Sequence, residues 1–337
     1  MAERYDDVRS LSQRELRAML ERGRPEERVW ALWALALASA PKDLAALVRR
    51  NEPDAGVRRN LAVVLAGHGE FDLLVALAKR DPAPEVRAAA MQLVTRLALD
   101  GKLPTALVVE RAAHDSAVRV AILGTVFADA PAWLREVARS LLGDPDRDVR
   151  YEAFEALVRA GRADVVAAIA WLDDASDDEA RVAVMRWTAG TPSAPGGERR
   201  VHTCALMLAH ANASHRLRRI VVECARVATW HDLAPIIQAD ATLVRAFIQR
   251  SADAAEQIQH IPPATLVAIA LREGGDKWLL AARDRLATVN VPDFELAPLL
   301  AEYRERCELR ARDLEGEPML QEELTLASEL AATLTLH

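Results

Sequence analysis

The chain has 337 residues, 51 % of them apolar and only 4 % aromatic, and a formal net charge of −7. Residues 1–291 carry as many basic as acidic side chains, so the negative charge comes from residues 292–337. This distribution gives neither the basic footprint typical of a nucleic-acid-binding protein nor a strongly acidic body.

The first residues favour a soluble, cytoplasmic protein. Residues 1–7 lack the apolar core of a signal peptide. The apolar run from Val29 to Ala40 is too short to span a bilayer. Alanine, leucine and valine dominate the apolar residues, with no strand-like alternation, which predicts an all-α protein. Three cysteines far apart in the sequence, Cys204, Cys224 and Cys307, are expected to be thiols in a reducing compartment.

A motif recurs along the first two thirds of the chain at a nearly constant interval. In Asp144–Ala153 (DPDRDVRYEA) it consists of an acidic turn, a Val-Arg pair, and a small or apolar residue three positions after the arginine. The motif arginines, 29 to 37 residues apart, are Arg28, Arg58, Arg87, Arg119, Arg150, Arg181 and Arg218. Self-similarity at this period predicts an array of helical hairpins, each of which buries its apolar face only against its neighbours.

Each motif is expected to begin the second helix of its hairpin. The first helices are predicted at residues 72–79, 104–113 and 132–142, ahead of three of the motifs. Side chains suited to an N-cap stand just before the motif arginines: Asp54, Asp115, Asp146, Ser214, and either Ser176 or Asp177.

These units resemble HEAT repeats, especially the short bacterial form that is also found in bilin-lyase-like proteins. Three segments carry the resemblance, which extends over roughly residues 12–230: Asp81–Ala90 (DPAPEVRAAA), Asp144–Ala153 and Ala117–Ala121 (AVRVA). The resemblance implies an α-solenoid, a right-handed superhelix of HEAT-like hairpins. It also implies a structural ladder of hydrogen bonds between turn aspartates and motif arginines of successive repeats, formed by Arg58, Arg87, Arg119, Arg150 and Arg181. Arg28 and Arg218 are weaker members, because their units lack the acid-Val-Arg form.

The repeat pattern divides the chain into three predicted domains. Residues 1–190 form an N-terminal repeat array, and residues 191–290 continue as degenerate helical repeats after a Gly- and Pro-rich loop at 190–197. This loop is a hinge, a contact loop or a plain insertion. In this part Asp240 and Val244-Arg245 mark an eighth unit, and helices are expected at 263–273 and 276–288. Residues 291–337 are predicted to form an atypical acidic helical hairpin that caps the open core, or alternatively docks a partner.

No pattern in the sequence predicts catalysis, a cofactor or a metal site. Gly67-His68-Gly69 and Gly274-Gly275 lack the spacing of phosphate-binding loops and are expected to be helix ends. His202, His210 and His215 are clustered in the sequence, but no carboxylate or cysteine completes a ligand set at a typical spacing.

The second helices are expected to line the inner face of the array, where a partner would bind. Arginine and aromatic side chains are enriched in protein interfaces. Trp30 and Trp33 are instead expected to fill gaps in the alanine-rich core. The predicted partner-binding residues are Arg59, Gln92, Arg96, Tyr151, Glu155, Arg159, Arg186, Trp187, Arg219 and Arg226.

Three functions follow as hypotheses. The favoured one is a scaffold or adaptor that binds a partner protein or peptide on its concave face without catalysis. The second is DNA binding, because bacterial alkylpurine DNA glycosylases built of HEAT-like repeats look similar; the neutral body disfavours it, since phosphate contacts dominate such affinity. The third, a bilin lyase or chaperone, is implied by the resemblance alone.

Overall fold

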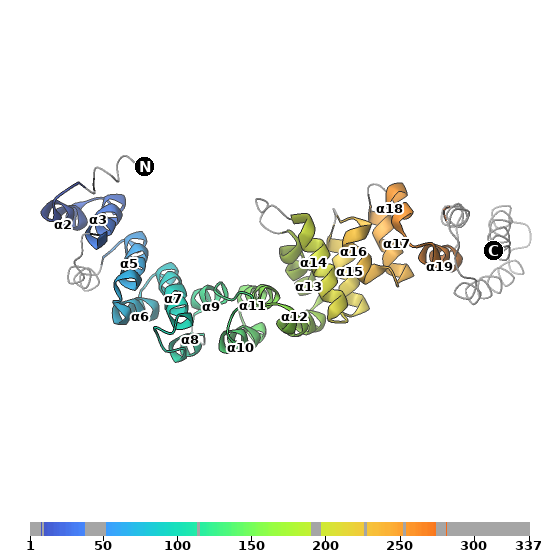
Figure 1. Cartoon of the computed structure of the whole chain (residues 1–337), viewed down its shortest axis with the longest axis horizontal. Coiled ribbons are helices and arrows are strands. Elements are labelled where there is room, and N and C mark those ends of the chain that lie inside the picture. The colour runs from blue at the N-terminus through green and yellow to red at the C-terminus, as the bar shows by residue number, and fades with distance from the viewer. Residues whose placement is uncertain are drawn as a thin grey trace, which may run out of the picture. The chain divides into compact units, whose positions relative to one another are not determined.

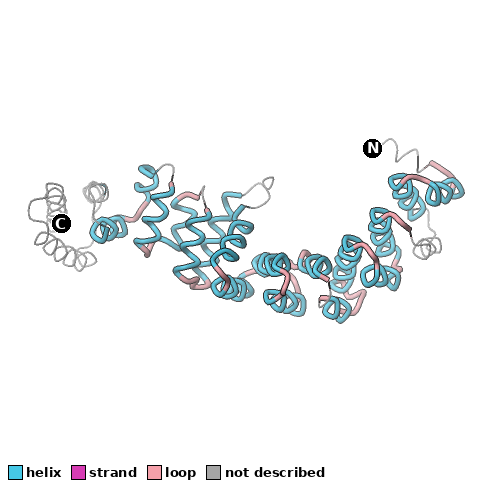
Figure 2. The backbone as a smooth tube through the Cα atoms, turned by 180° about the vertical axis from the view of Figure 1, so that it is seen from behind, coloured by secondary structure: helices cyan, strands magenta, loops and turns pink. Residues whose placement is uncertain are grey.

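The computed structural model describes Val8, residues 10–37, 52–112, 115–189, 197–225, 228–251 and 254–273, and Ala281. All regular secondary structure in these residues is helical, which confirms the all-α prediction for this part of the chain (Figure 2). None of the helices described is long and apolar enough to cross a membrane. Several predictions lie outside the described residues: most of the 190–197 loop, the helix at 276–288, Arg226, Cys307 and the C-terminal hairpin.

The chain divides into two compact units, Met1–Ala168 and Ile169–His337. The division falls within helix α12 (Arg162–Asp174), ahead of the loop at 190–197.

Successive hairpins of the first unit pack through every second helix. A row is formed by α3 (Pro25–Leu37), α5 (Ala55–His68), α7 (Pro84–Leu99), α9 (Ser116–Leu123) and α11 (Arg147–Ala160), each in contact with the next. The helices between them are α2 (Gln13–Arg22), α6 (Phe71–Arg80), α8 (Ala106–Arg111), α10 (Ala132–Ser140) and the 3-10 turn η1 (Leu141–Gly143). In Figure 1, α6, α8 and α10 form a second layer beside α5, α7, α9 and α11.

The second unit repeats this arrangement. Helices α13 (Asp177–Ala189), α15 (His215–Cys224), α17 (Ala241–Arg250) and α19 (Pro263–Glu273) pack in succession, and so do α14 (Gly197–His210), α16 (Trp230–Ile237) and α18 (Ala254–His260). Each of α13, α15 and α17 also packs on the helix that follows it. The predicted helix at 263–273 is α19. We call the helices α3, α5, α7, α9, α11, α13, α15, α17 and α19 the odd-numbered helices.

The sequence motif explains how the odd-numbered helices bury their inner side. The residue three positions after the motif arginine faces the core, and small side chains there allow the helices to approach closely. All seven such residues are at most 2 % exposed: Ala31, Leu61, Ala90, Ile122, Ala153, Val184 and Val221.

The predicted helix ends are also present. Backbone N–H groups of the first turns donate to the side chains of Asp54, Asp115, Asp146, Ser176 and Ser214. In the sixth copy the cap is therefore Ser176, and Asp177 is the first helical residue. Helix α5 stops at Gly69, whose φ of 76° is left-handed and suits glycine.

Candidate functional site

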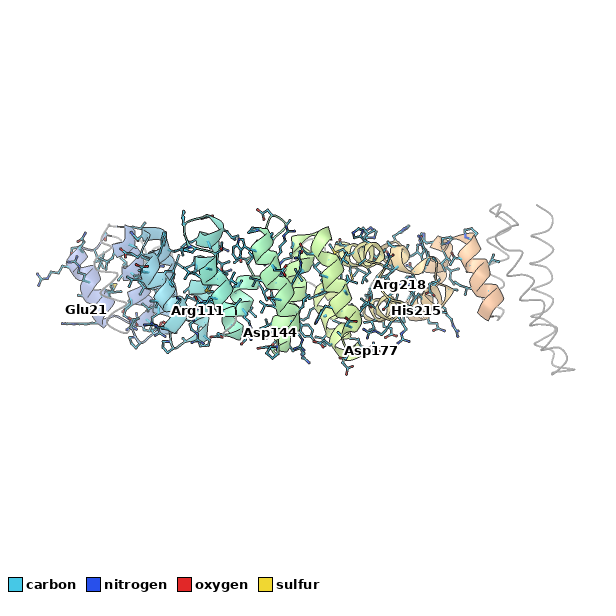
Figure 3. All side chains as sticks on the ribbon, turned by 90° about the horizontal axis from the view of Figure 1, so that it is seen from below. Glu21, Arg111, Asp144, Asp177, His215 and Arg218 are labelled. Carbon is cyan, nitrogen blue, oxygen red and sulfur yellow. The ribbon has the colours of Figure 1, made fainter. Side chains whose placement is uncertain are left out.

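A chain of arginine–carboxylate pairs links successive hairpins of the first unit. In each pair the arginine is the fourth residue of an odd-numbered helix and the acid stands in the turn that leads to the next one. The four pairs are Arg28–Glu52 at 2.8 Å, Arg58–Asp81 at 2.8 Å, Arg87–Asp115 at 2.7 Å and Arg119–Asp144 at 2.8 Å. Asp144, which precedes α11, is labelled in Figure 3. We call these four pairs the ladder.

Each turn acid serves two hairpins at once. The carboxylate of Asp81 accepts hydrogen bonds from Arg58 of the preceding hairpin and from the N–H of Ala83 at 2.9 Å. The carbonyl oxygen of Asp81 accepts from Nη1 of Arg87, six residues later, at 2.7 Å, and that of Pro82 accepts at 3.1 Å. The pairs Glu52 with Arg58 and Asp144 with Arg150 repeat the six-residue carbonyl contact. In these three turns the spacing from the acid and its proline to the arginine places both contacts, whereas Asp115 is followed by Ser116 and lacks this pattern.

Asp115 makes the ladder sensitive to acid. Burial alone raises the pKa of its carboxyl group, but hydrogen bonds from Arg87 and the Ala117 N–H, and the charges of Arg87 and Arg119, hold it below its ordinary value. A carboxyl group whose pKa is lower in the folded chain stabilises the fold above its unfolded pKa of about 4, and this stabilisation is lost as the pH falls through the folded value.

We therefore expect Asp115→Asn to lower the free energy of unfolding at pH 7 and to lose this effect as the pH falls below about 4, towards the lowered pKa of the folded carboxyl group. Urea unfolding of both proteins across this range measures the difference. In an Arg87→Gln background, which lacks the main donor, the pH dependence of the Asp115→Asn effect should shrink. An effect of equal size at pH 7 and pH 2.5 would contradict the assignment.

Arg181 does not continue the ladder, contrary to the prediction from the resemblance. Because Ser176 is the N-cap of α13, Arg181 is the fifth helical residue, and the fourth is the buried Ala180. One residue rotates a side chain by about 100° around a helix. Arg181 accordingly reaches Glu223 on α15, with Nη1 2.6 Å from Oε2.

Other residues connect the hairpins around α13 and α15. The turn before α15 has no acid, and its Ser214 donates from the backbone and the hydroxyl group to Asp173 at the end of α12. Arg216 donates to Asp177 at 2.5 Å and to three carbonyl groups between residues 172 and 175. Between α15 and the next odd-numbered helix, α17, the connection is made by His215, whose Nε2 lies 3.2 Å from Asp240 Oδ2.

The predicted partner-binding residues differ in their exposure to solvent. Arg59, Arg96, Arg186 and Arg219 are exposed, Gln92 and Glu155 are half-buried, and Arg226 lies outside the described residues. Tyr151 and Trp187 are only 1 % and 8 % exposed, so the expectation that they face a partner is wrong. Both aromatic side chains are therefore part of the alanine-rich core.

Arg159 is exposed but has a packing role. Helix α9 has 8 residues, whereas α7 has 16 and α11 has 14. Nη2 of Arg159 donates to the carbonyl oxygen of Leu123 at 3.2 Å, and its Nε lies 3.4 Å from that of Val126. A cation at the end of a helix compensates carbonyl groups that lack partners there. Arg159 of α11 thus caps the short α9.

Large apolar side chains are exposed on or beside the odd-numbered helices. Val63 lies on α5, Leu99 ends α7, Phe127 follows α9 at 53 % exposure, and Met185 lies on α13 beside Arg186. Sequence inspection missed them because apolar residues at helical spacing are normally assigned to the core. They interleave with Arg59, Arg96 and Arg186.

The structure also brings together histidines that the sequence analysis did not group. His202 Nδ1 lies 3.1 Å from the carbonyl oxygen of His231, whose ring centroid is 5.0 Å from that of His260. These residues lie on α14, α16 and α18 at equal intervals of 29, the signal that could have revealed them. In the part of the chain that the structure describes, no three ligand side chains are close enough to hold a metal ion.

Comparison with known proteins adds little. No protein-family model matches the sequence, and no curated protein matches it. The X-ray structure of YibA from E. coli is similar over 90 % of this chain and 96 % of its own, with 15 % identity and a TM-score of 0.37. Similarity at this level carries no argument about fold or function.

Proposed function

We propose that the protein is a scaffold or adaptor built as an α-solenoid of HEAT-like hairpins, which binds a partner protein or peptide along its odd-numbered helices. The observation that carries the proposal is the side-chain content of that surface. Exposed arginines alternate there with exposed apolar side chains, as in Arg96 with Leu99 and Met185 with Arg186. This mixture is typical of protein interfaces. Exposure of apolar side chains to water is unfavourable in free energy, and a bound partner would cover them.

The surface is extended because each odd-numbered helix packs on the next within its unit. Stacked hairpins create such a surface without a catalytic pocket. The ladder also supports a scaffold. Its arginines are paired with carboxylates that link neighbouring hairpins, so their role is structural and not catalytic.

DNA binding is the second candidate, and the geometry favours it less. Of the basic side chains on this surface, Arg159 is engaged with carbonyl groups and with Glu152 at 3.1 Å. Tyr151 and Trp187, the aromatic residues among the predicted partner-binding residues, are buried and cannot stack on bases. A mobility shift of duplex DNA at low salt and micromolar protein would favour this candidate. Bilin chemistry has no supporting feature among the described residues.

The scaffold proposal is tested with two exposed apolar residues of similar exposure. Phe127 follows α9, whereas Val109, 49 % exposed, lies on α8 in the other layer. Wild type, Phe127→Asp and Val109→Asp are immobilised, and proteins retained from the source cells are quantified by mass spectrometry. We expect a specific partner whose retention falls about tenfold or more in Phe127→Asp and remains unchanged in Val109→Asp.

Equal retention by all three proteins would contradict binding along the odd-numbered helices, and retention of nothing specific would contradict the scaffold itself. Circular dichroism of both variants is the control for folding, since both substitutions are at exposed positions.

A further inference from the structure

Arg218 stands at a ladder position in the second unit, but the described residues give it no carboxylate. With Ser214 as the N-cap of α15, it is the fourth helical residue, as Arg58, Arg87 and Arg119 are in their helices. Each of those three holds a turn acid of the next hairpin. The Nε of Arg218 is buried, and no acceptor for it is found in the described part of the chain. Arg28 also has a buried Nε without an acceptor but holds Glu52 through Nη2, whereas the Arg218 guanidinium group makes no hydrogen bond or ion pair with any described residue. Figure 3 labels Arg218 and His215 on α15.

The acid that would complete this step of the ladder is already engaged. It is Asp240, the N-cap of α17, which corresponds to Asp115 at the start of α9. Asp240 accepts from the Thr242 hydroxyl group at 2.6 Å and from the N–H of Thr242 at 3.0 Å, and its Oδ2 lies 3.2 Å from His215 Nε2. His215 therefore occupies the acid that in the first unit receives the fourth-position arginine.

The surroundings of Arg218 favour an anion. Helices α15 and α17, which pack on each other, carry five arginines and a single acidic residue, Glu223. Glu223 is paired with Arg181 at 2.6 Å and with Arg219 at 3.6 Å. Arg219 and Arg245, the fifth residues of their helices, are exposed. An incoming carboxylate thus meets positive charge in the absence of a competing free acid on these two helices.

We infer that Arg218 is the docking point for a carboxylate side chain of an acidic segment of the partner protein, which supplies in trans the acid that the ladder lacks here. The planar guanidinium group matches a carboxylate with two parallel hydrogen bonds, and its half-buried position strengthens them. The exposed Arg219 and Arg245 add positive charge beside neighbouring acidic side chains of the same segment. This inference rests on the proposed function, because it takes the partner to be a protein.

The test uses the full chain and a fluorescein-labelled peptide of alternating glutamate and alanine, with a glutamine–alanine peptide as the uncharged control. Fluorescence anisotropy at low salt compares wild type with Arg218→Gln. The matched control is Arg80→Gln, an exposed arginine at the end of α6, outside the odd-numbered helices, whose loss changes the net charge equally. We expect wild type to bind the glutamate peptide only, Arg218→Gln to weaken binding about tenfold, and Arg80→Gln to change it less than about twofold.

Thermal unfolding supplies a second readout. Arg218→Gln removes no internal carboxylate pair, so its Tm should stay near that of wild type, whereas Arg119→Gln should lower Tm by several degrees. A large loss of Tm in Arg218→Gln would show an internal acid partner and overturn the inference. Absence of peptide binding, equal weakening by both arginine variants, or tighter binding of a duplex DNA would overturn it as well.

The outcomes are separable from those of the scaffold proposal. If a partner is retained and its binding is unchanged in Arg218→Gln, the docking point at Arg218 is wrong, whereas the scaffold proposal stands. Loss of retention in Phe127→Asp concerns the first unit and is independent of Arg218.

Discussion

Replacing Asp144 with alanine is expected to lower the free energy of unfolding by roughly 3–5 kcal/mol, the usual cost of removing one partner of a buried ion pair. The Asp144 side chain is 5 % exposed and that of Arg119 is 11 % exposed. The substitution leaves the Arg119 guanidinium without its carboxylate and removes the acceptor of the Asp146 N–H, 2.8 Å away. Urea denaturation followed by circular dichroism measures the change.

The control is Asp148→Ala, two residues into α11. This carboxylate is exposed in the first helical turn, where its interaction with the helix dipole contributes less than about 1 kcal/mol. Comparable losses in Asp144→Ala and Asp148→Ala would mean that the ladder pair contributes no more than a surface charge.

Replacing Phe154 with alanine should destabilise the chain by about 3–5 kcal/mol, because its ring is fully buried in α11 and its removal leaves a cavity. A close-packed core relaxes only in part around such a cavity, so the loss exceeds the transfer free energy of the ring alone. Guanidinium denaturation of the purified variant gives the difference in unfolding free energy.

Phe127→Ala is the matched control for this experiment. The same side chain is lost at a position that is 53 % exposed, so we expect a change of less than about 1 kcal/mol. If Phe127→Ala proved as destabilising as Phe154→Ala, the Phe127 ring would be a core residue, and its assignment to the partner-binding surface would be wrong.

The sequence predicts local features well because they depend on neighbouring residues. The N-caps of α5, α9, α11 and α15, and the buried residue three positions after each motif arginine, follow from short-range chemistry. The contacts of Arg58, Arg87 and Arg119 with the next turn acids match the ladder that the resemblance to HEAT repeats implied.

Predictions that depend on a single residue of register were less reliable. The choice between Ser176 and Asp177 as N-cap decided whether Arg181 became the fourth or fifth helical residue, and this rotated it from a turn acid to Glu223. Likewise, the sequence could not show that Tyr151 and Trp187 are buried, because the volume left by alanines becomes visible only when the helices are packed. The row of His202, His231 and His260 required the contacts between α14, α16 and α18.

Each turn acid contacts both the hairpin before it and the hairpin after it, and this restricts how repeats can be gained or lost in evolution. Each of the segments that begin with Glu52 and Asp81 brings an acid for the hairpin before it and an arginine for the hairpin after it. Tandem copying or excision of one whole segment would therefore leave every guanidinium group matched with a carboxylate. Copying or removing only part of a segment would leave an arginine or an acid of the ladder without its partner, so gene duplication and loss in this unit are expected to proceed in whole hairpins.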